Sequence, residues 1–209
     1  MPEVTALFWD VGGVILSNGW DRGARLAAAK KFGLEWEEFQ DRHDLASSAY
    51  EAGRITLDTY LERTVFYRKR NFTREEFTAF IFAQSQELPE SRAVLSDLAA
   101  TGKYFLATVN NEGREINEYR IRQFHLKREF KAFFSSCYLG IRKPDERIYS
   151  LALEVTQCQP EECVFIDDRE LNLECARALG IRTIQFRDAA QLRRDLAANG
   201  VIGATVATK

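Results

Sequence analysis

Residues 4–10, with the sequence VTALFWD, decide the fold of this chain. The first six are apolar or favour β-structure, and the run ends in Asp10, two residues before the turn-forming pair Gly12 and Gly13. This pattern predicts a buried strand that delivers a carboxylate at its end.

Similar apolar runs recur along the chain and alternate with helical patterns. The runs are YFLA at residues 104–107, AFFSSCY at 132–138, CVFI at 163–166 and IRTIQF at 181–186. Helical periodicity marks residues 91–100, 115–124, 145–156, 171–179 and 189–198. Continuous apolar strands that alternate with helices are typical of a parallel sheet covered on both faces. We therefore expect an α/β fold, a Rossmann-like, doubly wound parallel sheet of about five strands.

The segment between the first two strands has a different character. Residues 20–88 contain no strand pattern, and their apolar spacing predicts four helices, at residues 21–32, 35–50, 57–67 and 74–86. We interpret residues 18–88 as an inserted four-helix subdomain, with residues 1–17 and 89–209 forming the α/β core.

Composition narrows the class of partner. The 29 basic and 31 acidic residues give a formal net charge of -2, and no segment carries a basic stripe, so we do not expect nucleic acid as a partner. The N-terminus lacks a signal-peptide pattern, and no apolar run approaches the roughly 18 residues that span a membrane. We expect a cytoplasmic protein that does not contact membrane, and we leave open a homodimer formed through the four helices.

Polar residues gather where the predicted strands end. They are, in chain order, Asp10, Thr108, Asn110, Asn111, Lys143, Asp167 and Asp168. Ligands of an open parallel sheet bind outside the carboxyl ends of its strands, so these side chains should face one crevice. Three carboxylates in one crevice repel one another unless a cation neutralises them, and Mg²⁺ prefers oxygen ligands.

This set of groups suits phosphoryl transfer. Asp10 could attack phosphorus and form an aspartyl-phosphate, while Lys143 and the cation stabilise the charge on the equatorial oxygens. Thr108 could donate a hydrogen bond to a phosphate oxygen, and Asn110 and Asn111 are further candidates for contact with the substrate. By contrast, His43 and Asp44 have no companion at metal-ligand spacing, and we expect them on the surface of a helix.

Four motifs in this order resemble those of the haloacid dehalogenase superfamily. They read FWDVGGVIL from Phe8, LATVNN from Leu106, RKPDERIY from Arg142 and VFIDDRELN from Val164. The resemblance implies a nucleophilic Asp10, a phosphate-binding Thr108 and a charge-stabilising Lys143. It also implies that Asp168 binds Mg²⁺ with support from Asp167, and that residues 18–88 form a helical cap over the site.

The chain departs from the usual phosphatase pattern at Gly12, where the family normally has a second aspartate that protonates the leaving group. The resemblance implies that this position also offers a backbone carbonyl to magnesium, which glycine retains. A subgroup similar to α-D-glucose-1-phosphate phosphatases carries the same Asp-x-Gly sequence. We therefore expect a Mg²⁺-dependent phosphatase that acts on a small phosphorylated metabolite, with a sugar phosphate preferred.

Two other functions remain open at this point. A metal-independent 2-haloacid dehalogenase would use the same aspartate to attack carbon, although the acidic pair Asp167 and Asp168 favours a cation. A phosphate-binding protein with little turnover would explain the missing acid at Gly12, although it would have no need to keep Asp10 and Lys143.

Overall fold

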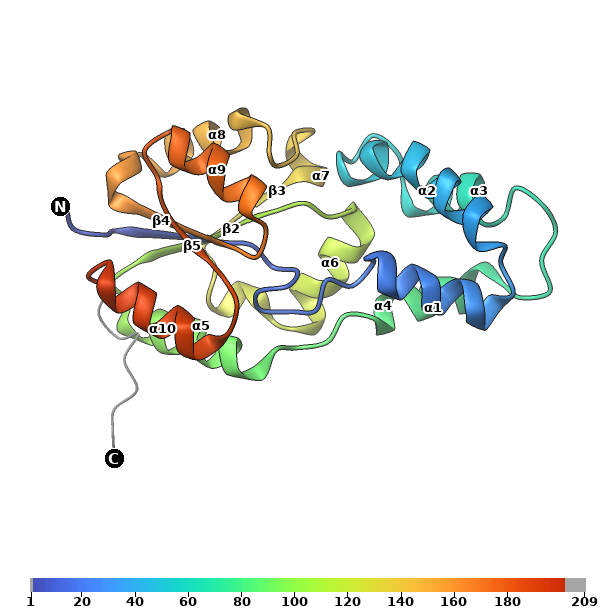
Figure 1. Cartoon of the computed structure of the whole chain (residues 1–209), viewed down its shortest axis with the longest axis horizontal. Helices are drawn as coiled ribbons and strands as arrows, with labels where there is room; N and C mark the ends of the chain where they lie inside the picture. The colour runs from blue at the N-terminus through green and yellow to red at the C-terminus, as the bar shows by residue number, and fades with distance from the viewer. Residues whose placement is uncertain (1, 202–209) are drawn as a thin grey trace.

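A five-stranded parallel sheet forms the centre of the computed structural model, which describes residues 2–201 (Figure 1). Its strand order is β3-β2-β1-β4-β5. The strands are β1 (Ala6–Trp9), β2 (Phe105–Asn110), β3 (Ala132–Ser135), β4 (Cys163–Asp167) and β5 (Arg182–Gln185). The predicted α/β fold is confirmed, and β1, which carries the first motif, lies in the middle of the sheet.

Helices cover both faces of this sheet because the strand side chains alternate in direction. Leu7 and Trp9 of β1 pack in one buried cluster with α5 (Pro89–Thr101) and α10 (Ala189–Ala198). Ala6 and Phe8 pack in another, with α8 (Glu146–Thr156) and α9 (Glu170–Ala178). Both faces of β1 are therefore buried, as its continuous apolar sequence requires.

Four helices between β1 and α5 bury a separate apolar core, and we call them and their loops the helical lobe (Figure 1, the end opposite the N-terminus). They are α1 (Arg22–Phe32), α2 (Trp36–Glu51), α3 (Leu57–Thr64) and α4 (Arg74–Ala83). The core is rich in aromatic rings, with Phe77 in ring contact with Trp20, Phe32 and Phe39. All four predicted helices are present, but α3 and α4 each end three residues earlier than expected.

The two chain segments that join the lobe to the sheet run side by side. Ser17 donates its amide to the carbonyl of Gln86 at 2.8 Å, and the Gln86 amide donates to Ser17 Oγ at 2.9 Å. Arg120, which is buried on α6 (Arg114–Gln123), donates Nη2 to the Ser17 carbonyl at 3.0 Å. These contacts tie the entry and exit of the lobe to one helix of the α/β core.

Two predicted strand boundaries were wrong. Strand β2 continues to Asn110 rather than ending at residue 107. The strand expected over residues 132–138 ends at Ser135, and α7 (Ser136–Leu139) follows it. Ser136 leaves the ladder because its Oγ donates to the carbonyl of Glu51 at 2.6 Å, and Gly140, at φ 72°, ends the short helix.

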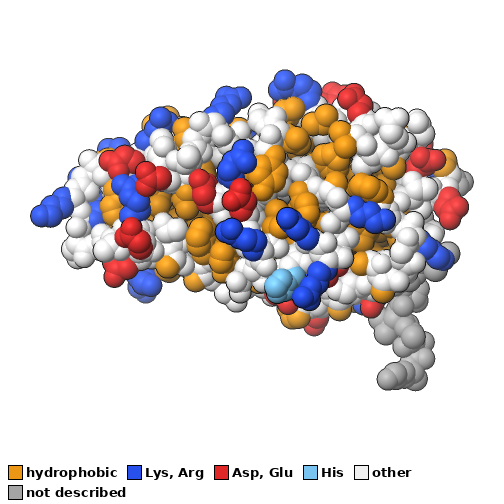
Figure 2. All heavy atoms as spheres, turned by 180° about the vertical axis from the view of Figure 1, so that it is seen from behind, with side chains coloured by type: hydrophobic (Ala, Val, Ile, Leu, Met, Phe, Trp, Pro, Cys, Tyr) orange, Lys and Arg blue, Asp and Glu red, His pale blue; other side chains and the backbone are white. Residues whose placement is uncertain are grey.

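The surface of the molecule carries charges of both signs. On the face opposite that of Figure 1, Lys and Arg side chains are interspersed with Asp and Glu, and hydrophobic side chains lie between them (Figure 2). Among residues 2–201, no helix has the length and apolar character needed to cross a bilayer.

Candidate active site

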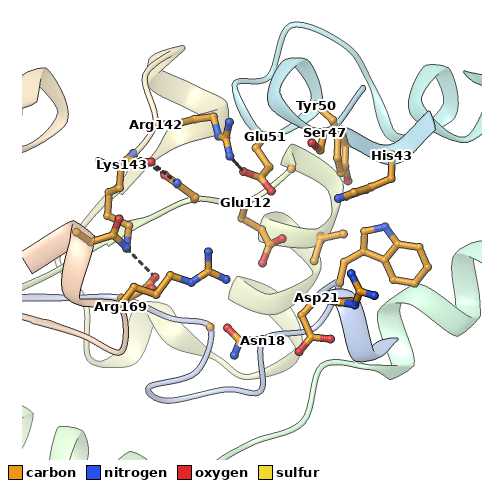
Figure 3. Close-up of a pocket in the computed structure, with 18 of the residues that line it drawn as sticks. Asn18, Asp21, His43, Ser47, Tyr50, Glu51, Glu112, Arg142, Lys143 and Arg169 are labelled. Atoms are coloured by element: carbon orange, nitrogen blue, oxygen red, sulfur yellow. Dashed lines mark hydrogen bonds and ion pairs between the residues drawn. The ribbon is translucent and has the colours of Figure 1, made fainter. Parts of the chain in front are cut away.

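A cavity of about 500 Å³ lies between the carboxyl ends of the strands and the helical lobe (Figure 3). Asp10, Asn111 and Lys143 line it from the α/β core. Trp20, Arg25 and His43 line it from the lobe. The cavity therefore lies at the sheet edge where ligands of open α/β folds bind.

Asp10 follows β1 directly and is held by one of its two carboxylate oxygens. Its amide donates to the carbonyl of Ile166 at 2.8 Å, which fixes the backbone beside β4. Oδ1 accepts from the Val11 amide at 2.7 Å and lies 3.1 Å from Lys143 Nζ. Within the described part of the chain nothing is hydrogen-bonded to Oδ2, so this oxygen is available as a nucleophile.

Lys143 bridges two acidic side chains from neighbouring strands. Its Nζ is buried, lies 3.1 Å from Asp10 Oδ1 and donates to Asp167 Oδ2 at 2.6 Å. The loop that carries it is fixed by Asn111, whose Oδ1 accepts from the Lys143 amide and whose Nδ2 donates to the Lys143 carbonyl, both at 2.8 Å. Asn111, predicted to contact the substrate, lines the cavity while its amide group positions Lys143.

The two consecutive aspartates have different surroundings. Asp167 is fully buried and accepts from the Arg169 amide at 2.8 Å and from Asn172 Nδ2 at 3.0 Å, in addition to Lys143. Asp168 keeps Oδ1 buried without a hydrogen-bond partner among the described residues. Asp167 is thus committed to orienting the lysine, whereas Asp168 has an oxygen to offer to a cation.

The acidic groups of the site are crowded. One carboxylate oxygen each of Asp10, Asp167 and Asp168 lies within 4.8 Å of the others. Burial raises the pKa of Asp10 above its ordinary value, against the opposing effect of Lys143, and burial with the Asp167 charge raises the pKa of Asp168. Burial alone would lower the pKa of Lys143, but the negative charges of Asp10 and Asp167 raise it above its ordinary value. A divalent cation would relieve the repulsion between these carboxylates. Mg²⁺ prefers carboxylate oxygens as ligands, and Asp168 Oδ1 has no other partner among the described residues.

Glycine is required beside this cluster. Gly13 has φ 77°, and a Cβ there would lie 2.5 Å from Asp168 Oδ2. Only glycine lets the loop after Asp10 pass so close to Asp168, which follows β4. Gly12 lines the cavity, and its φ is not in the left-handed region.

Thr108 and Asn110 are not among the residues that line the cavity. Thr108 is paired with Trp9 inside the sheet, is fully buried, and its Oγ1 has no hydrogen-bond partner among the described residues. Asn110 donates Nδ2 to Asn117 Oδ1 at 3.1 Å and accepts from Ser135 Oγ at 2.8 Å. Because β2 runs three residues further than predicted, Thr108 lies within the strand rather than at its end. Its phosphate contact and the substrate contact of Asn110 stay predictions.

Sequence patterns missed Glu112 and Arg120, which form an ion pair at 2.6 Å on the same cavity. Burial raises the pKa of Glu112 to about 7, although the Arg120 charge acts in the opposite direction. Glu112 follows Asn111 directly, so its place after a strand end was the available signal. Arg120 comes from the middle of helix α6, and its sequence position gave no signal of a place at the cavity.

His43 is buried and lines the cavity, so its predicted place on a helix surface was wrong. Its Nδ1 lies 2.7 Å from the hydroxyl of Tyr60, which accepts from Trp20 Nε1 at 2.8 Å. Burial, with the nearby Arg25 charge, lowers the pKa of His43 to about 4. The imidazole is therefore neutral near pH 7.

Comparison with known proteins agrees with this geometry. The sequence profile of the haloacid dehalogenase-like hydrolases matches residues 4–180, and the chain belongs to this family of hydrolases. It is 24% identical to the D-ribitol-5-phosphate phosphatase of Bacteroides thetaiotaomicron over 208 residues, which cover 91% of this chain and 95% of that protein. It is 39% identical to bifunctional epoxide hydrolase 2 of Rattus norvegicus over 71 residues, which are 34% of this chain and span only 13% of that protein's length.

Among solved structures, the fold is similar to that of a haloacid dehalogenase family enzyme from Bacteroides thetaiotaomicron in complex with magnesium and inorganic phosphate. The TM-score is 0.72 at 22% identity, with 88% of this chain and 94% of that chain covered. At this level of identity the match supports the fold alone.

Proposed function

We propose that the protein is a Mg²⁺-dependent phosphatase that hydrolyses a small phosphorylated metabolite through an aspartyl-phosphate on Asp10. The observation that carries the proposal is the free Oδ2 of Asp10 beside Lys143 at one edge of a cavity, with the unpaired Oδ1 of Asp168 in the acidic cluster that includes Asp10. A nucleophile, a fixed positive charge and an oxygen for a cation are the groups that phosphoryl transfer needs.

The side chains divide the chemistry between them. Asp10 attacks phosphorus with Oδ2, and Lys143, held by Asp167, stabilises the charge on the phosphoryl oxygens. Asp10, Asp168 and the backbone carbonyl of Gly12 would hold Mg²⁺, with Asp167 in support. When bound, the ion neutralises phosphate charge and lets the phosphate approach a carboxylate.

The cavity favours a substrate with more than a phosphate group. Its volume of about 500 Å³ lies in the range of small-molecule sites. Polar groups from the lobe, among them Arg25, His43 and Ser47, line it next to the indole of Trp20. Hydroxyl groups that need several hydrogen-bond partners suit such walls, so we favour a sugar or polyol phosphate, as in the name of the relative from Bacteroides thetaiotaomicron.

We further propose that residues 18–88 act as a cap, with residues 1–17 and 89–209 as the catalytic core. The lobe supplies one wall of the cavity and is joined to the core by the paired segments at Ser17 and Gln86. Closure of such a cap would exclude water and select the substrate.

Phosphate release from a panel of sugar phosphates, nucleotides and an activated aryl phosphate tests the proposal, with magnesium or with excess chelator. We expect magnesium-dependent turnover that falls at least about 10³-fold in Asp10→Asn, which keeps the shape of the side chain but removes the nucleophile. No turnover on any phosphate would contradict the proposal, and halide release from a 2-haloacid would then identify a dehalogenase.

A further inference from the structure

Hydrolysis of an alkyl phosphate requires a proton on the departing oxygen, and the residue that provides it is not obvious here. Gly12 has no side chain. The cavity is lined by four acidic residues, Asp10, Asp21, Glu51 and Glu112, and by His43. Asp10 is the nucleophile of the proposed reaction, which leaves four side chains to consider.

Three of these four are committed to other contacts. Asp21 is exposed and caps α1 by accepting from the Ala24 amide at 2.8 Å. Glu51 is in an ion pair with Arg142 and, with its side chain 29% exposed, is less enclosed than Glu112. His43, with its pKa lowered to about 4, has lost its acidic proton well below neutral pH.

Glu112 has the geometry of a proton donor. Its side chain is 11% exposed, and Oε2 forms an ion pair with Arg120 Nη1 at 2.6 Å. No side chain among the described residues is hydrogen-bonded to Oε1, and the carboxylate points into the cavity (Figure 3). One oxygen is thus fixed by Arg120, and the carboxyl group faces the space that a substrate would occupy.

The ion pair also links Glu112 to the loop after the nucleophile. A Cβ on Gly12 would lie 3.5 Å from Arg120 Nη1, the same nitrogen that contacts Glu112. The guanidinium is itself anchored, because Nη2 donates to the Ser17 carbonyl and Nε donates to Ser85 Oγ, both at 3.0 Å. A single fixed guanidinium group therefore separates the Glu112 carboxyl from Gly12.

We propose that Glu112 is the general acid of this site and donates the proton of its carboxyl group to the oxygen that leaves phosphorus, which rests on the phosphatase function proposed above. As Asp10 Oδ2 forms its bond to phosphorus, the bond to the leaving oxygen breaks and that oxygen takes the proton, giving an alcohol, an aspartyl-phosphate and the Glu112 carboxylate. Water then attacks phosphorus and gives a proton to Glu112. This step releases phosphate, frees Asp10 and restores the acid.

The groups around Glu112 bring the titration of its carboxyl group close to neutral pH, where part of the population is protonated. Burial and the negative charge of Glu51 raise its pKa, whereas Arg120 and the Gly113 amide lower it, with a resulting value of about 7. Tyr50 and Cys137 also interact electrostatically with Glu112, and burial raises the pKa of both, so they stay neutral in this range. A carboxyl group with a pKa close to the working pH is well suited to general acid catalysis.

The dependence on leaving group tests the assignment with the full-length protein and Mg²⁺. We expect Glu112→Gln to lower kcat/KM for D-ribitol 5-phosphate or another alkyl phosphate turned over by the native protein by about 10²- to 10⁴-fold, because a poor leaving group needs the proton. The loss on an activated aryl phosphate, whose leaving group needs little protonation, should stay below about tenfold. The native alkyl-phosphate profile should also fall above pH about 7, and the variant should lack this fall.

Asp21→Asn is the matched control, since it neutralises another carboxylate of the same cavity, one that is not among the groups shifting the pKa of Glu112, and should change both substrates by a similar factor. An equal loss on both substrates in Glu112→Gln, or none on the alkyl phosphate, would overturn the assignment while leaving the phosphatase intact. A native protein without phosphatase activity would overturn the proposed function and the assignment together.

Discussion

The two walls of the cavity are built differently. On the strand-end wall, Asp10 and Lys143 line the cavity. Asp10 and the adjoining Asp167 and Asp168 each follow or end a strand, and the parallel ladder fixes their spacing. On the lobe wall, Arg25 and His43 come from helices and find their partners inside the lobe. The positions of the side chains on the strand-end wall are therefore fixed by backbone pairing, and those on the lobe wall by helix packing. Substitutions in the two walls should differ in their effects on stability and activity.

The largest effect is expected on the strand-end wall, from Lys143→Met. Removing the buried ammonium leaves Asp10 and Asp167 facing each other without a counter-charge, which should lower the free energy of unfolding by about 3–5 kcal/mol. Phosphate release should fall about 10²- to 10³-fold. Urea unfolding measures the change in stability, and phosphate-release kinetics measure the change in activity. Lys127→Met, at an exposed lysine, is the control. Native-like stability in Lys143→Met would show that the ladder alone holds this wall.

An intermediate effect is expected where the lobe meets the α/β core. Gly53 and Gly33 both have positive φ, but a Cβ on Gly53 would lie 2.1 Å from the Cys137 carbonyl oxygen, whereas Gly33 has open space. Gly33→Ala should cost about 1–2 kcal/mol from the backbone conformation alone. Gly53→Ala should cost at least about 1 kcal/mol more, because the Cys137 backbone must shift.

Thermal unfolding of the two glycine variants measures that difference, and it isolates the contact between lobe and core. Equal destabilisation would mean that the lobe moves away from α7 without cost. Larger destabilisation of Gly53→Ala, together with reduced activity, would show that this contact positions the lobe wall.

The smallest effect is expected on the lobe wall, from the titration of His43. Its pKa is about 4 in the folded protein and near 6.5 in the unfolded chain, so the unfolded state binds more protons between these values and stability falls as pH drops through this window. From pH 7 to pH 5 this group should remove about 1–2 kcal/mol. His43→Gln should lose that part of the pH dependence in urea unfolding, and an unchanged slope would contradict the assigned burial effect.

The strand-end wall could be predicted because its signal is local. A continuous apolar run followed by Asp10, or by Asp167 and Asp168, marks both a buried strand and the residue at its end, and the fold rule then brings those ends together. Thr108 was predicted at a strand end, and that place depended on where β2 ends. An error of three residues in that boundary moved it from the wall into the sheet.

The lobe wall and the Glu112–Arg120 pair could not be predicted, for a physical reason. Which face of α2 turns His43 toward the cavity depends on its packing against Tyr60 and Trp20, and amphipathic spacing alone does not choose between a buried polar residue and a surface one. Arg120 contacts Ser17 and Ser85, far away in sequence, and such partners follow only from the tertiary fold. The absence of nucleic acid partners, the cytoplasmic location and a homodimer stay predictions.

The most direct test of the central claim is to look for the phosphoryl group on Asp10 itself. Acid-quenching the protein during turnover of an alkyl phosphate with Mg²⁺, followed by peptide mass spectrometry, should show one added phosphoryl group on the peptide that contains Asp10. Asp10→Asn should not show it. Turnover of the substrate with no phosphorylated Asp10 at any quench time, or with the phosphoryl group on another residue, would contradict the account.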